Sequence, residues 1–425
     1  MKNKASIAKT IQGLFNNEKF CRICGKEGFE LILNLGWQPL ANALISKKEL
    51  DKPVVIYPLT LVRCQWCGCL QIRETVPPDA LFTKYLYFSS YAEALVASAR
   101  ELSARLISEI GLGPNNLVVD LGSNDGYLLQ FYKAADVPVL GVEAAKNVAK
   151  VAQKERGIPT LVDFFSEEVA DRIRKEYGSA SIIHANNIIA HLANLHSFLD
   201  GIRILLDSSG VVVAEVAYVK NMIDTGAFDL IYHEHLCYYS LSNLELLFHK
   251  HHLEVFNVEH IPSHGGSLRI YAGHPSVHGK TKALQNFRKL EEISGMGDSF
   301  YYEEFAQRVM KLQQSLVRTI EKVRQEGCRI VAYGAAAKAT VLLNYLSIGD
   351  ESLEYIVDRN PSKHHKILPG KNLTIHPVEQ IEIDKPEIIL VTAWNYAEEI
   401  MRQLTAHKKR GGKFIIPLPT LRIVG

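Results

Sequence analysis

The stretch Leu117-Val-Val-Asp-Leu-Gly-Ser-Asn-Asp-Gly126 decides the fold of the middle of this chain. Its first four residues form a short apolar run that ends on an acid, which is typical of a buried strand, and residues 122–126 form a turn. Residues 127–133 then open a helix, and residues 139–143 form a second strand just after Pro138, which is tolerated there. A strand, turn, helix and strand in this order predict an α/β fold with a doubly wound parallel sheet.

The alternation continues toward the C-terminus. Further strands are predicted at residues 181–185, 210–215, 329–332, 355–358 and 388–391, and further helices at residues 79–110, 298–326 and 334–346. The second of these helices ends at Gly327, a plausible C-terminal cap. The fold class that we expect is α/β, with a central Rossmann-like sheet and a smaller Rossmann-like lobe after it.

Length and composition exclude several classes of protein. A chain of 425 residues is long enough for two or three domains, and 47% hydrophobic with 22% charged residues excludes a disordered chain or a rod. The net charge of +2 gives no support for a nucleic-acid or membrane-surface partner. The sequence contains no uninterrupted run of about 18 apolar residues, so we expect no transmembrane helix. Lys9 interrupts the apolar stretch near the N-terminus, so no signal-peptide core forms there and we expect a cytoplasmic protein. We also expect a monomer.

Two cysteine pairs predict a metal site near the N-terminus. Cys21-Arg-Ile-Cys24 and Cys64-Gln-Trp-Cys67 can place four thiolates around a tetrahedral zinc ion. Four cysteines leave no open coordination position, so we interpret the zinc as structural. The alternative is four buried free cysteines. Cys69 adjoins the second pair and is interpreted as a bystander, and an odd count of seven does not indicate a disulfide framework.

The acids and glycines of the central stretch predict a small-molecule site. Gly122 allows close approach of a ligand to the backbone, and the following helix start offers free N–H groups. Asp120 ends the first strand, and Glu143 ends the second, where a carboxylate can accept both hydroxyls of a ribose. The Gly-x-x-x-Gly spacing resembles motif I of S-adenosylmethionine-dependent methyltransferases rather than a dinucleotide fingerprint. The alternative is an ordinary strand–turn–helix corner.

Motifs along the whole chain, taken together, resemble the zinc-containing deoxysugar C-methyltransferases that act on nucleotide-linked 4-keto sugars. Beside the two cysteine pairs, the resemblance rests on Leu35-Gly-Trp-Gln-Pro-Leu40, Tyr85-Leu-Tyr-Phe-Ser-Ser90, Gly122-Ser-Asn-Asp-Gly126, Asp163-Phe-Phe165, Ala185-Asn-Asn187, Tyr232-His-Glu-His235, His264-Gly-Gly266, Tyr333-Gly-Ala-Ala-Ala-Lys338 and Ala393-Trp-Asn395. It spans about residues 21–417, and the order of the motifs is more specific than any one of them. Ala144 replaces a usual proline, and Tyr91 and Ser267 also depart from the pattern, which bears on substrate detail.

The resemblance implies three domains and the residues that bind the methyl donor. The domains are a zinc-binding domain at 15–76, a methyltransferase domain at 79–297 and a C-terminal α/β domain at 298–425 that binds the nucleotide sugar. The residues implied for S-adenosylmethionine are Tyr87, Ser90, Asp120, Gly122, Asn124, Gly126, Glu143, Asp163, Phe164, Asn186 and Asn187.

The motif Tyr232-His-Glu-His235 carries the predicted chemistry. Methylation beside a ketone needs a base for the carbon-bound proton and a donor for the enolate oxygen, and histidine titrates near neutrality. By resemblance His235 is the base, Glu234 orients it or holds a sugar hydroxyl, and Tyr232 and Tyr85 donate or shape the pocket. If the motif is extended, His233 faces the same side as His235 and remains a rival base. The alternative is that His235 is a structural histidine at the boundary of a secondary-structure element.

Other histidines and the C-terminal lobe complete the candidates. His249, His251 and His252 lack metal-ligand spacing, and we expect them on a solvated helix face. By resemblance the C-terminal lobe holds the nucleotide diphosphate, at a strand–helix junction and at the end of a later strand. The implied substrate-binding residues are His264, Gly265, Gly266, Arg269, Tyr333, Gly334, Lys338, Trp394 and Asn395. The first three, with Arg269, can form a loop that faces the sugar, and the alternatives are a simple turn and a purely structural lobe.

The sequence therefore predicts a methyltransferase that transfers a methyl group from S-adenosylmethionine to a carbon next to the ketone of a nucleotide-linked 4-keto-deoxysugar. Two other classes stay open at this stage. One is an NAD-dependent nucleotide-sugar oxidoreductase that uses the second Rossmann-like unit, and the other is a non-catalytic zinc module tethered to a methyltransferase-like fold. The residues do not identify the sugar, the nucleotide or the carbon that is methylated.

Overall fold

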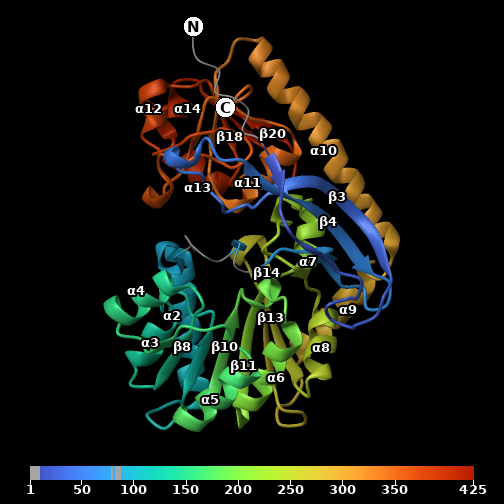
Figure 1. Ribbon diagram of the computed structural model, residues 1–425, viewed down its shortest axis with the longest axis vertical. Coiled ribbons are helices and arrows are strands. Elements are labelled where there is room, and N and C mark those ends of the chain that lie inside the picture. The colour runs from blue at the N-terminus through green and yellow to red at the C-terminus, as the bar shows by residue number, and fades with distance from the viewer. Residues whose placement is uncertain (1–9, 78–79, 82–87) are drawn as a thin grey trace.

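The computed structural model describes residues 10–77, 80–81 and 88–425, and this part of the chain forms three large sheets and one two-stranded ribbon. In Figure 1 the N-terminal sheet lies along one side of the molecule, the central sheet lies at the bottom and the C-terminal lobe lies at the top. The N-terminal sheet contains β1 (Thr10–Gln12), β3 (Phe29–Pro39), β4 (Val54–Cys64), β5 (Leu70–Ile72) and β12 (Cys237–Tyr238). A small ribbon of β2 (Asn16–Asn17) and β6 (Glu74–Thr75) adjoins it.

The long hairpin β3–β4 fills the interval between the two cysteine pairs. Its strands pair antiparallel, from Phe29 opposite Cys64 to Pro39 opposite Ile56. Leu59 and Leu61 are both fully buried, as the two-residue period of a half-buried strand requires. The fifth strand, β12, comes from far along the chain and pairs with β5. The zinc-module sheet is thus completed by the segment that directly follows the Tyr232–His235 motif.

The central sheet has the strand order β13-β14-β11-β10-β7-β8-β9, which confirms the predicted α/β class. Its strands are β7 (Val118–Leu121), β8 (Val139–Val142), β9 (Thr160–Leu161), β10 (Ala180–Asn186), β11 (Leu206–Ala217), β13 (Glu254–Ile261) and β14 (Ser267–Gly273). β7 to β11 pair parallel, and β14 runs antiparallel to both of its neighbours. The helices are α2 (Glu93–Ile110), α3 (Leu129–Lys133), α4 (Lys146–Glu155), α5 (Glu167–Tyr177), α6 (Leu195–Leu205), α7 (Val219–Thr225), α8 (Leu241–Lys250) and α9 (Lys282–Ile293).

The helix predicted over residues 79–110 is shorter than expected. Of its described part, Glu93–Ile110 is α2, and a 3-10 turn, η2 (Ser89–Tyr91), precedes it across an extended Ala92. The backbone N–H of Ser89 donates to Asn124 Oδ1 at 2.9 Å instead of to a helical carbonyl. The contact with the central turn therefore interrupts the predicted helix at residues 88–92.

The C-terminal lobe is a second doubly wound sheet with the order β17-β16-β15-β18-β19-β20. Its strands are β15 (Ile330–Tyr333), β16 (Ile356–Val357), β17 (Ile375–His376), β18 (Ile388–Val391), β19 (Lys413–Ile416) and β20 (Arg422–Val424). Its helices are α11 (Ala337–Tyr345), α12 (Gln380–Asp384), α13 (Ala397–Gln403) and α14 (Thr405–Lys409). The predicted long helix is confirmed as α10 (Ser299–Gln325), which Asp298 caps through the N–H of Phe300 and which runs along the outside of the molecule between the two α/β units (Figure 1).

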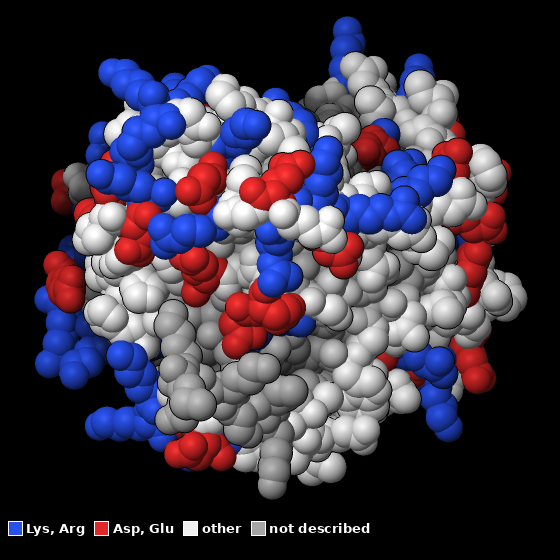
Figure 2. All heavy atoms as spheres, turned by 90° about the horizontal axis from the view of Figure 1, so that it is seen from above, with Lys and Arg blue, Asp and Glu red and all other residues white. Residues whose placement is uncertain are grey.

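Charges of both signs are interspersed on the surface. Figure 2, seen from above the C-terminal lobe, shows Lys and Arg among Asp and Glu, as a net charge near zero leads one to expect. Among the helices of the described chain, α10 is the longest, and none is both long and apolar enough for a bilayer.

Candidate active site and metal centre

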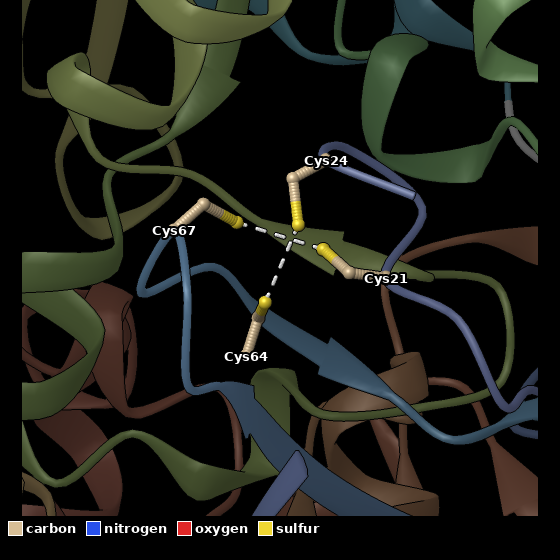
Figure 3. Close-up of side chains that lie close together, drawn as sticks. All are labelled: Cys21, Cys24, Cys64 and Cys67. Atoms are coloured by element: carbon tan, nitrogen blue, oxygen red, sulfur yellow. Dashed lines mark hydrogen bonds between the residues drawn. The ribbon is translucent and has the colours of Figure 1, made fainter. Parts of the chain in front are cut away.

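The four cysteines of the two pairs meet at one point, at the end of the β3–β4 hairpin (Figure 3). Their sulfur atoms all lie within 4.8 Å of one another, with 3.6 Å between Cys21 and Cys67 and 3.5 Å between Cys24 and Cys64. Sulfurs around a tetrahedral zinc ion, each bonded at about 2.3 Å, are about 3.8 Å apart. The donor set and its spacing therefore fit zinc, and the set is the only such metal-ligand group within the described part of the chain.

Two tight turns bring the sulfurs together. Gly25 N donates to Cys21 O at 2.8 Å, and Gly68 N donates to Cys64 O at 3.0 Å. Both glycines have positive φ, 74° and 70°, which side-chain-bearing residues rarely adopt. The glycine that follows each cysteine pair is thus needed for the tight turn that the pair forms.

The turn after β7 is built for close approach to the backbone. Gly122, Asn124 and Gly126 all have positive φ, and a Cβ at Gly122 would lie 2.5 Å from Ile188 Cδ1. Gly122 N donates to Val142 O at 2.8 Å, which ties the turn to the end of β8. The turn therefore lies at the carboxyl ends of β7 and β8, which is where the sequence analysis expects a small-molecule site.

Two buried acids stand at this edge of the sheet. Glu143 is 9% exposed, and its two oxygens accept the backbone N–H groups of Asn124 and Ala145 at 2.9 and 2.8 Å. Burial raises the pKa of Glu143, and these two N–H groups oppose the rise. Asp120 is 2% exposed, and its Oδ2 has no hydrogen-bond partner within the described part of the chain. Burial, and after it the charges of Glu143 and Glu215, raises the pKa of Asp120.

Other predicted donor-site residues surround the same edge. Asn186 ends β10 with a buried, unpartnered Oδ1, and Asn187 follows with a positive φ of 56°. Asp163 pairs with Arg172 at 2.8 Å, and Phe164 is 59% exposed after β9. The N–H of Ser90 donates to Asp125 Oδ2 at 3.4 Å, which brings η2 to the turn. The predictions for Tyr85 and Tyr87 fall on residues outside those that the structure describes.

The catalytic candidates lie on a turn rather than on an extended strand. His235 N donates to Tyr232 O at 2.8 Å, which closes the turn. His235 Nδ1 lies 3.1 Å from Leu230 O, and its Nε2 lies 2.8 Å from the Tyr232 hydroxyl. A carbonyl only accepts, so Nδ1 carries the proton of a neutral ring and Nε2 carries the lone pair.

The other two residues of the motif, His233 and Glu234, contact residues of the N-terminal part of the chain. His233 is 1% exposed, and its Nε2 donates to Pro58 O of β4 at 3.0 Å. Burial lowers the pKa of His233 to about 4. Glu234 is 5% exposed and accepts from Asn42 Nδ2 at 2.7 Å, and burial raises its pKa to about 7. The expectation that His233 and His235 share one face is wrong, because it required an extended segment.

Sequence reasoning missed His191. It lies in the 3-10 turn η3 (Ile189–His191), just after the predicted donor-site residues at the end of β10, and its ring packs edge-on against His235 with 4.9 Å between ring centres. Leu236 N donates to Ala190 O at 2.7 Å, which links η3 to the residue that follows the turn at Tyr232–His235. The order Asn187, Ile188 and His191 in one short loop was the signal available, since Ile188 reaches Gly122 and His191 reaches His235.

Arg269 does not lie in a loop that faces a ligand. It is in the middle of β14, 6% exposed, with its Nε 2.7 Å from Glu215 Oε1 and its Nη1 3.3 Å from Glu259 Oε2. Its Nη2 donates to Ser98 Oγ of α2 at 3.3 Å. The loop prediction is wrong for Arg269, because two antiparallel strands continue to that residue.

The neighbouring glycines form the β13–β14 connection. Gly265 ends the 3-10 turn η5 (Ser263–Gly265), and Gly266 O accepts from Tyr218 N at 3.0 Å. A Cβ at Gly266 would lie 2.2 Å from Asn221 Nδ2, so that close approach requires glycine. The side chain of His264 is outside the described part of the structure.

One histidine of the cluster near residue 250 is not on a solvated face. His251 is 6% exposed, with its Nε2 2.8 Å from His196 Nδ1 and its Nδ1 3.0 Å from Asp200. The expectation is wrong here, because His251 is the C-terminal cap of α8 and turns inward against α6.

The predicted C-terminal residues gather at the carboxyl ends of β15 and β18. A Cβ at Gly334 would lie 2.6 Å from Ala393 Cβ, so the two strand ends are in close contact. Lys338 Nζ lies 3.3 Å from Asn395 Oδ1 and 4.8 Å from the ring centre of Trp394. Burial lowers the pKa of Lys338. The hydroxyl of Tyr333 points away from this group and donates to Gln403 at 3.2 Å.

Comparisons with known proteins agree with this arrangement of zinc module, central sheet and C-terminal lobe. The chain is 32% identical over 405 residues to the C-methyltransferase NovU of Streptomyces niveus, which covers 95% of this chain and 96% of that protein. The chain belongs to the C-methyltransferase family. Family models for a zinc binding domain, a methyltransferase domain and a C-methyltransferase C-terminal domain match residues 21–82, 92–258 and 262–419.

Solved methyltransferases are similar over a smaller part of the chain. One from Anabaena variabilis is 19% identical and covers 41% of this chain and 84% of its own, with a TM-score of 0.34. The magnesium protoporphyrin IX methyltransferase of Synechocystis PCC 6803 is 11% identical and covers 42% and 79%, with a TM-score of 0.33.

This C-methyltransferase is an S-adenosylmethionine-dependent enzyme with a structural zinc ion. The membership favours methyl transfer over the NAD-dependent oxidoreductase and the non-catalytic scaffold. The buried oxygens of Asp120 and Asn186, which have no hydrogen-bond partner among the described residues, and the close approach at Gly122 fit a bound donor molecule at the edge of the central sheet.

Proposed function

We propose that this C-methyltransferase methylates a carbon adjacent to the ketone of a nucleotide-linked 4-keto-deoxysugar, and that His235 is the base. The observation that supports this most is the Leu230–His235–Tyr232 arrangement, which leaves the basic nitrogen Nε2 facing a phenol hydroxyl. Through His191 this turn adjoins the loop that also contacts Gly122 of the donor site. Base and donor pocket are therefore neighbours.

The residues have distinct tasks in the proposed reaction. His235 Nε2 takes the proton from the carbon next to the ketone, and the C–H electron pair moves to the enolate. Once substrate replaces it at His235 Nε2, the Tyr232 hydroxyl donates to the enolate oxygen, with Tyr85 as a second donor. Glu234 holds a sugar hydroxyl or orients the base. When bound, S-adenosylmethionine supplies an electrophilic methyl group on its sulfonium. Holding both reactants in one pocket provides much of the acceleration.

We assign the donor pocket to the edge of the central sheet. Glu143 accepts the ribose hydroxyls, and the turn 122–126 contacts the donor through its backbone. The remaining proposed contacts are Tyr87, Ser90, Asp120, Asp163, Phe164, Asn186 and Asn187.

The C-terminal lobe is proposed to hold the nucleotide diphosphate of the substrate. Its carboxyl edge contains the close turn at Gly334, the cation Lys338 and the amide of Asn395. A cation beside small residues at a strand–helix junction is suited to phosphate oxygens. Gly265, Gly266 and His264, at the β13–β14 connection, are proposed to face the sugar.

Incubation with a panel of nucleotide-linked sugars tests the proposal. The panel contains 4-keto-deoxysugars with different nucleotides, and each is matched by the corresponding sugar that lacks the ketone. We expect labelled methyl to enter only the keto compounds, on a carbon. Transfer to a non-keto sugar, or to oxygen, would contradict the proposed substrate class.

A further inference from the structure

A buried carboxyl group links the C-terminal lobe to the catalytic turn. Asp229 lies in the middle of the 3-10 turn η4 (Phe228–Leu230) and has no exposed surface. Its Oδ2 accepts from Trp394 Nε1 at 2.7 Å, across the boundary between the two α/β units. A buried carboxyl with such a short bond to an indole N–H holds both partners in a defined geometry.

A cation completes this contact. Lys338, at the start of α11, lies over the Trp394 ring. Burial raises the pKa of Asp229, and the charge of Lys338 opposes that rise. In return, Asp229 favours the charged form of Lys338, against the effect of burial. Phe228, on the other side of Asp229, packs against Tyr345 at the end of α11 with 5.2 Å between ring centres. Residues of the C-terminal lobe therefore contact both Phe228 and Asp229 of η4.

The residue after Asp229 acts directly on His235. Leu230 O is the acceptor for His235 Nδ1 at 3.1 Å, and it also accepts from the Tyr238 hydroxyl at 3.4 Å. The position of this carbonyl decides which ring nitrogen carries the proton. Any rotation of η4 that withdraws the carbonyl would allow the proton to move to Nε2, which would remove the basic lone pair.

We propose that Asp229 is a positioning residue: held by Trp394, it fixes η4 so that the Leu230 carbonyl orients His235 and keeps its proton on Nδ1. This inference rests on the proposed role of His235 as the base. It gives Trp394 a task other than contact with substrate, because its indole N–H is already bonded to Asp229. The C-terminal lobe thereby sets the protonation pattern of the catalytic turn.

Three variants and a control separate this role from a general loss of structure. Asp229→Ala removes the acceptor, Trp394→Phe removes the donor but keeps an aromatic ring, and Asp229→Asn keeps an acceptor for the indole. Arg308→Met is the control, since Arg308 Nη2 donates to Ile223 O at 2.8 Å and links α10 to α7 without touching η4. If Asp229→Ala does not fold, Trp394→Phe decides the question.

The readout is the nitrogen NMR spectrum of full-length protein labelled in its histidine rings, with His235 identified by the loss of its signals in His235→Asn. We expect protonated Nδ1 and unprotonated Nε2 in the wild type, in Asp229→Asn and in Arg308→Met. In Asp229→Ala and Trp394→Phe the two signals should move toward the average of both tautomers. With a substrate in hand, kcat should fall roughly 10–100-fold in these two variants, with KM for the donor unchanged.

Retention of the wild-type tautomer in Asp229→Ala or Trp394→Phe would overturn the inference, as would an equal change in Arg308→Met. The tautomer is measured without substrate, so this result does not depend on the proposed reaction. Full activity of His235→Asn would instead refute the role of His235 as base, and it would leave the tautomer measurement intact.

Discussion

The side-chain amide of Asn42 lies 2.7 Å from the carboxyl group of Glu234, and this contact joins the zinc module to the turn at Tyr232–His235. Asn42 follows β3 and Glu234 precedes β12, so 192 positions separate them in the chain. A second contact acts in the same direction, since His233 binds Pro58 O of β4. Residues of the N-terminal sheet and its β3–β4 connection therefore hold the turn that contains the proposed base.

Replacement of Asn42 by alanine should change the pH dependence of the reaction. Asn42 opposes the rise in the pKa of Glu234 that burial causes, so Asn42→Ala should raise that pKa further above about 7. If the ionised form of Glu234 assists the base, the acidic limb of the pH–rate profile should shift to higher pH. Asn34→Ala is the matched control, because Asn34 lies in the same hairpin and its side chain accepts from Gly36 N at 2.8 Å. An unchanged profile in Asn42→Ala would contradict this role.

Glu234→Gln should make stability less dependent on pH. The pKa of Glu234 is about 7 in the fold against 4.5 in the reference state, so the buried ionised form costs stability as pH rises through this window. The full effect, reached above pH 7, is of the order of 3 kcal/mol. The variant keeps an acceptor for Asn42 and should lose less stability between pH 5 and pH 8, measured by urea unfolding. An equal loss in wild type and variant would show that Glu234 titrates near its ordinary value.

Loss of one zinc ligand should affect the active site as well as the metal. Wild type should contain one zinc ion per chain, and Cys64→Ser should lower that content because it removes one of the four thiolates. The effect should extend to the proposed active site, because Cys64 ends β4, the strand that also contains Pro58. Hydrogen exchange should rise first in β3, β4 and β12. Cys328→Ser is the control, since Cys328 lies outside the four-sulfur cluster. Zinc-free wild type, prepared without chelators, would refute the metal assignment.

The donor site should depend on Glu143. Glu143→Ala removes the acceptor proposed for the ribose hydroxyls, and it should weaken S-adenosylmethionine binding by roughly 1–3 kcal/mol in calorimetry. Glu143→Gln should lose less, since one oxygen remains for the N–H of Asn124 or Ala145. Glu155→Ala, an exposed acid at the end of α4, is the control. Unchanged affinity in Glu143→Ala would place the ribose elsewhere.

Local spacing predicted the parts of the fold that local interactions determine. The turn at Gly122 and Gly126 and the tight turn of each cysteine pair depend on residues close together in the chain, and both are confirmed. The two cysteine pairs meet across the β3–β4 hairpin, and their matching spacing was enough to predict that meeting. The start of α2 was missed because Ser89 bonds to Asn124 instead of to its own helix.

Contacts between distant segments were beyond what periodicity can report. The pairing of β12 with β5, the ion pair of Arg269 with Glu215 and the approach of Asn42 to Glu234 each join elements that the sequence separates widely. Arg269 shows the difference most clearly. An arginine near two glycines suggests a binding loop, whereas the register of β14 opposite β11 places it beside Glu215.

His235→Asn should abolish proton abstraction while leaving both ligand sites intact. Asparagine can still donate to Leu230 O but accepts no proton near neutral pH, so turnover should fall about 10²–10⁴-fold. Zinc content and donor affinity should not change, because His235 contacts neither site in the described structure. The decisive measurement is exchange of the carbon-bound proton of the sugar with deuterated solvent, which isolates this step from methyl transfer.

The matched variant is His233→Asn, which changes the same residue type two positions earlier. His233 donates to Pro58 O and is almost fully buried, so its loss should lower the free energy of unfolding and leave exchange comparatively intact. If the His233 variant loses exchange and the His235 variant keeps the wild-type rate, the base is His233. That outcome would require the turn at Tyr232 to open on substrate binding, because only an extended segment brings His233 to the side that His235 now occupies.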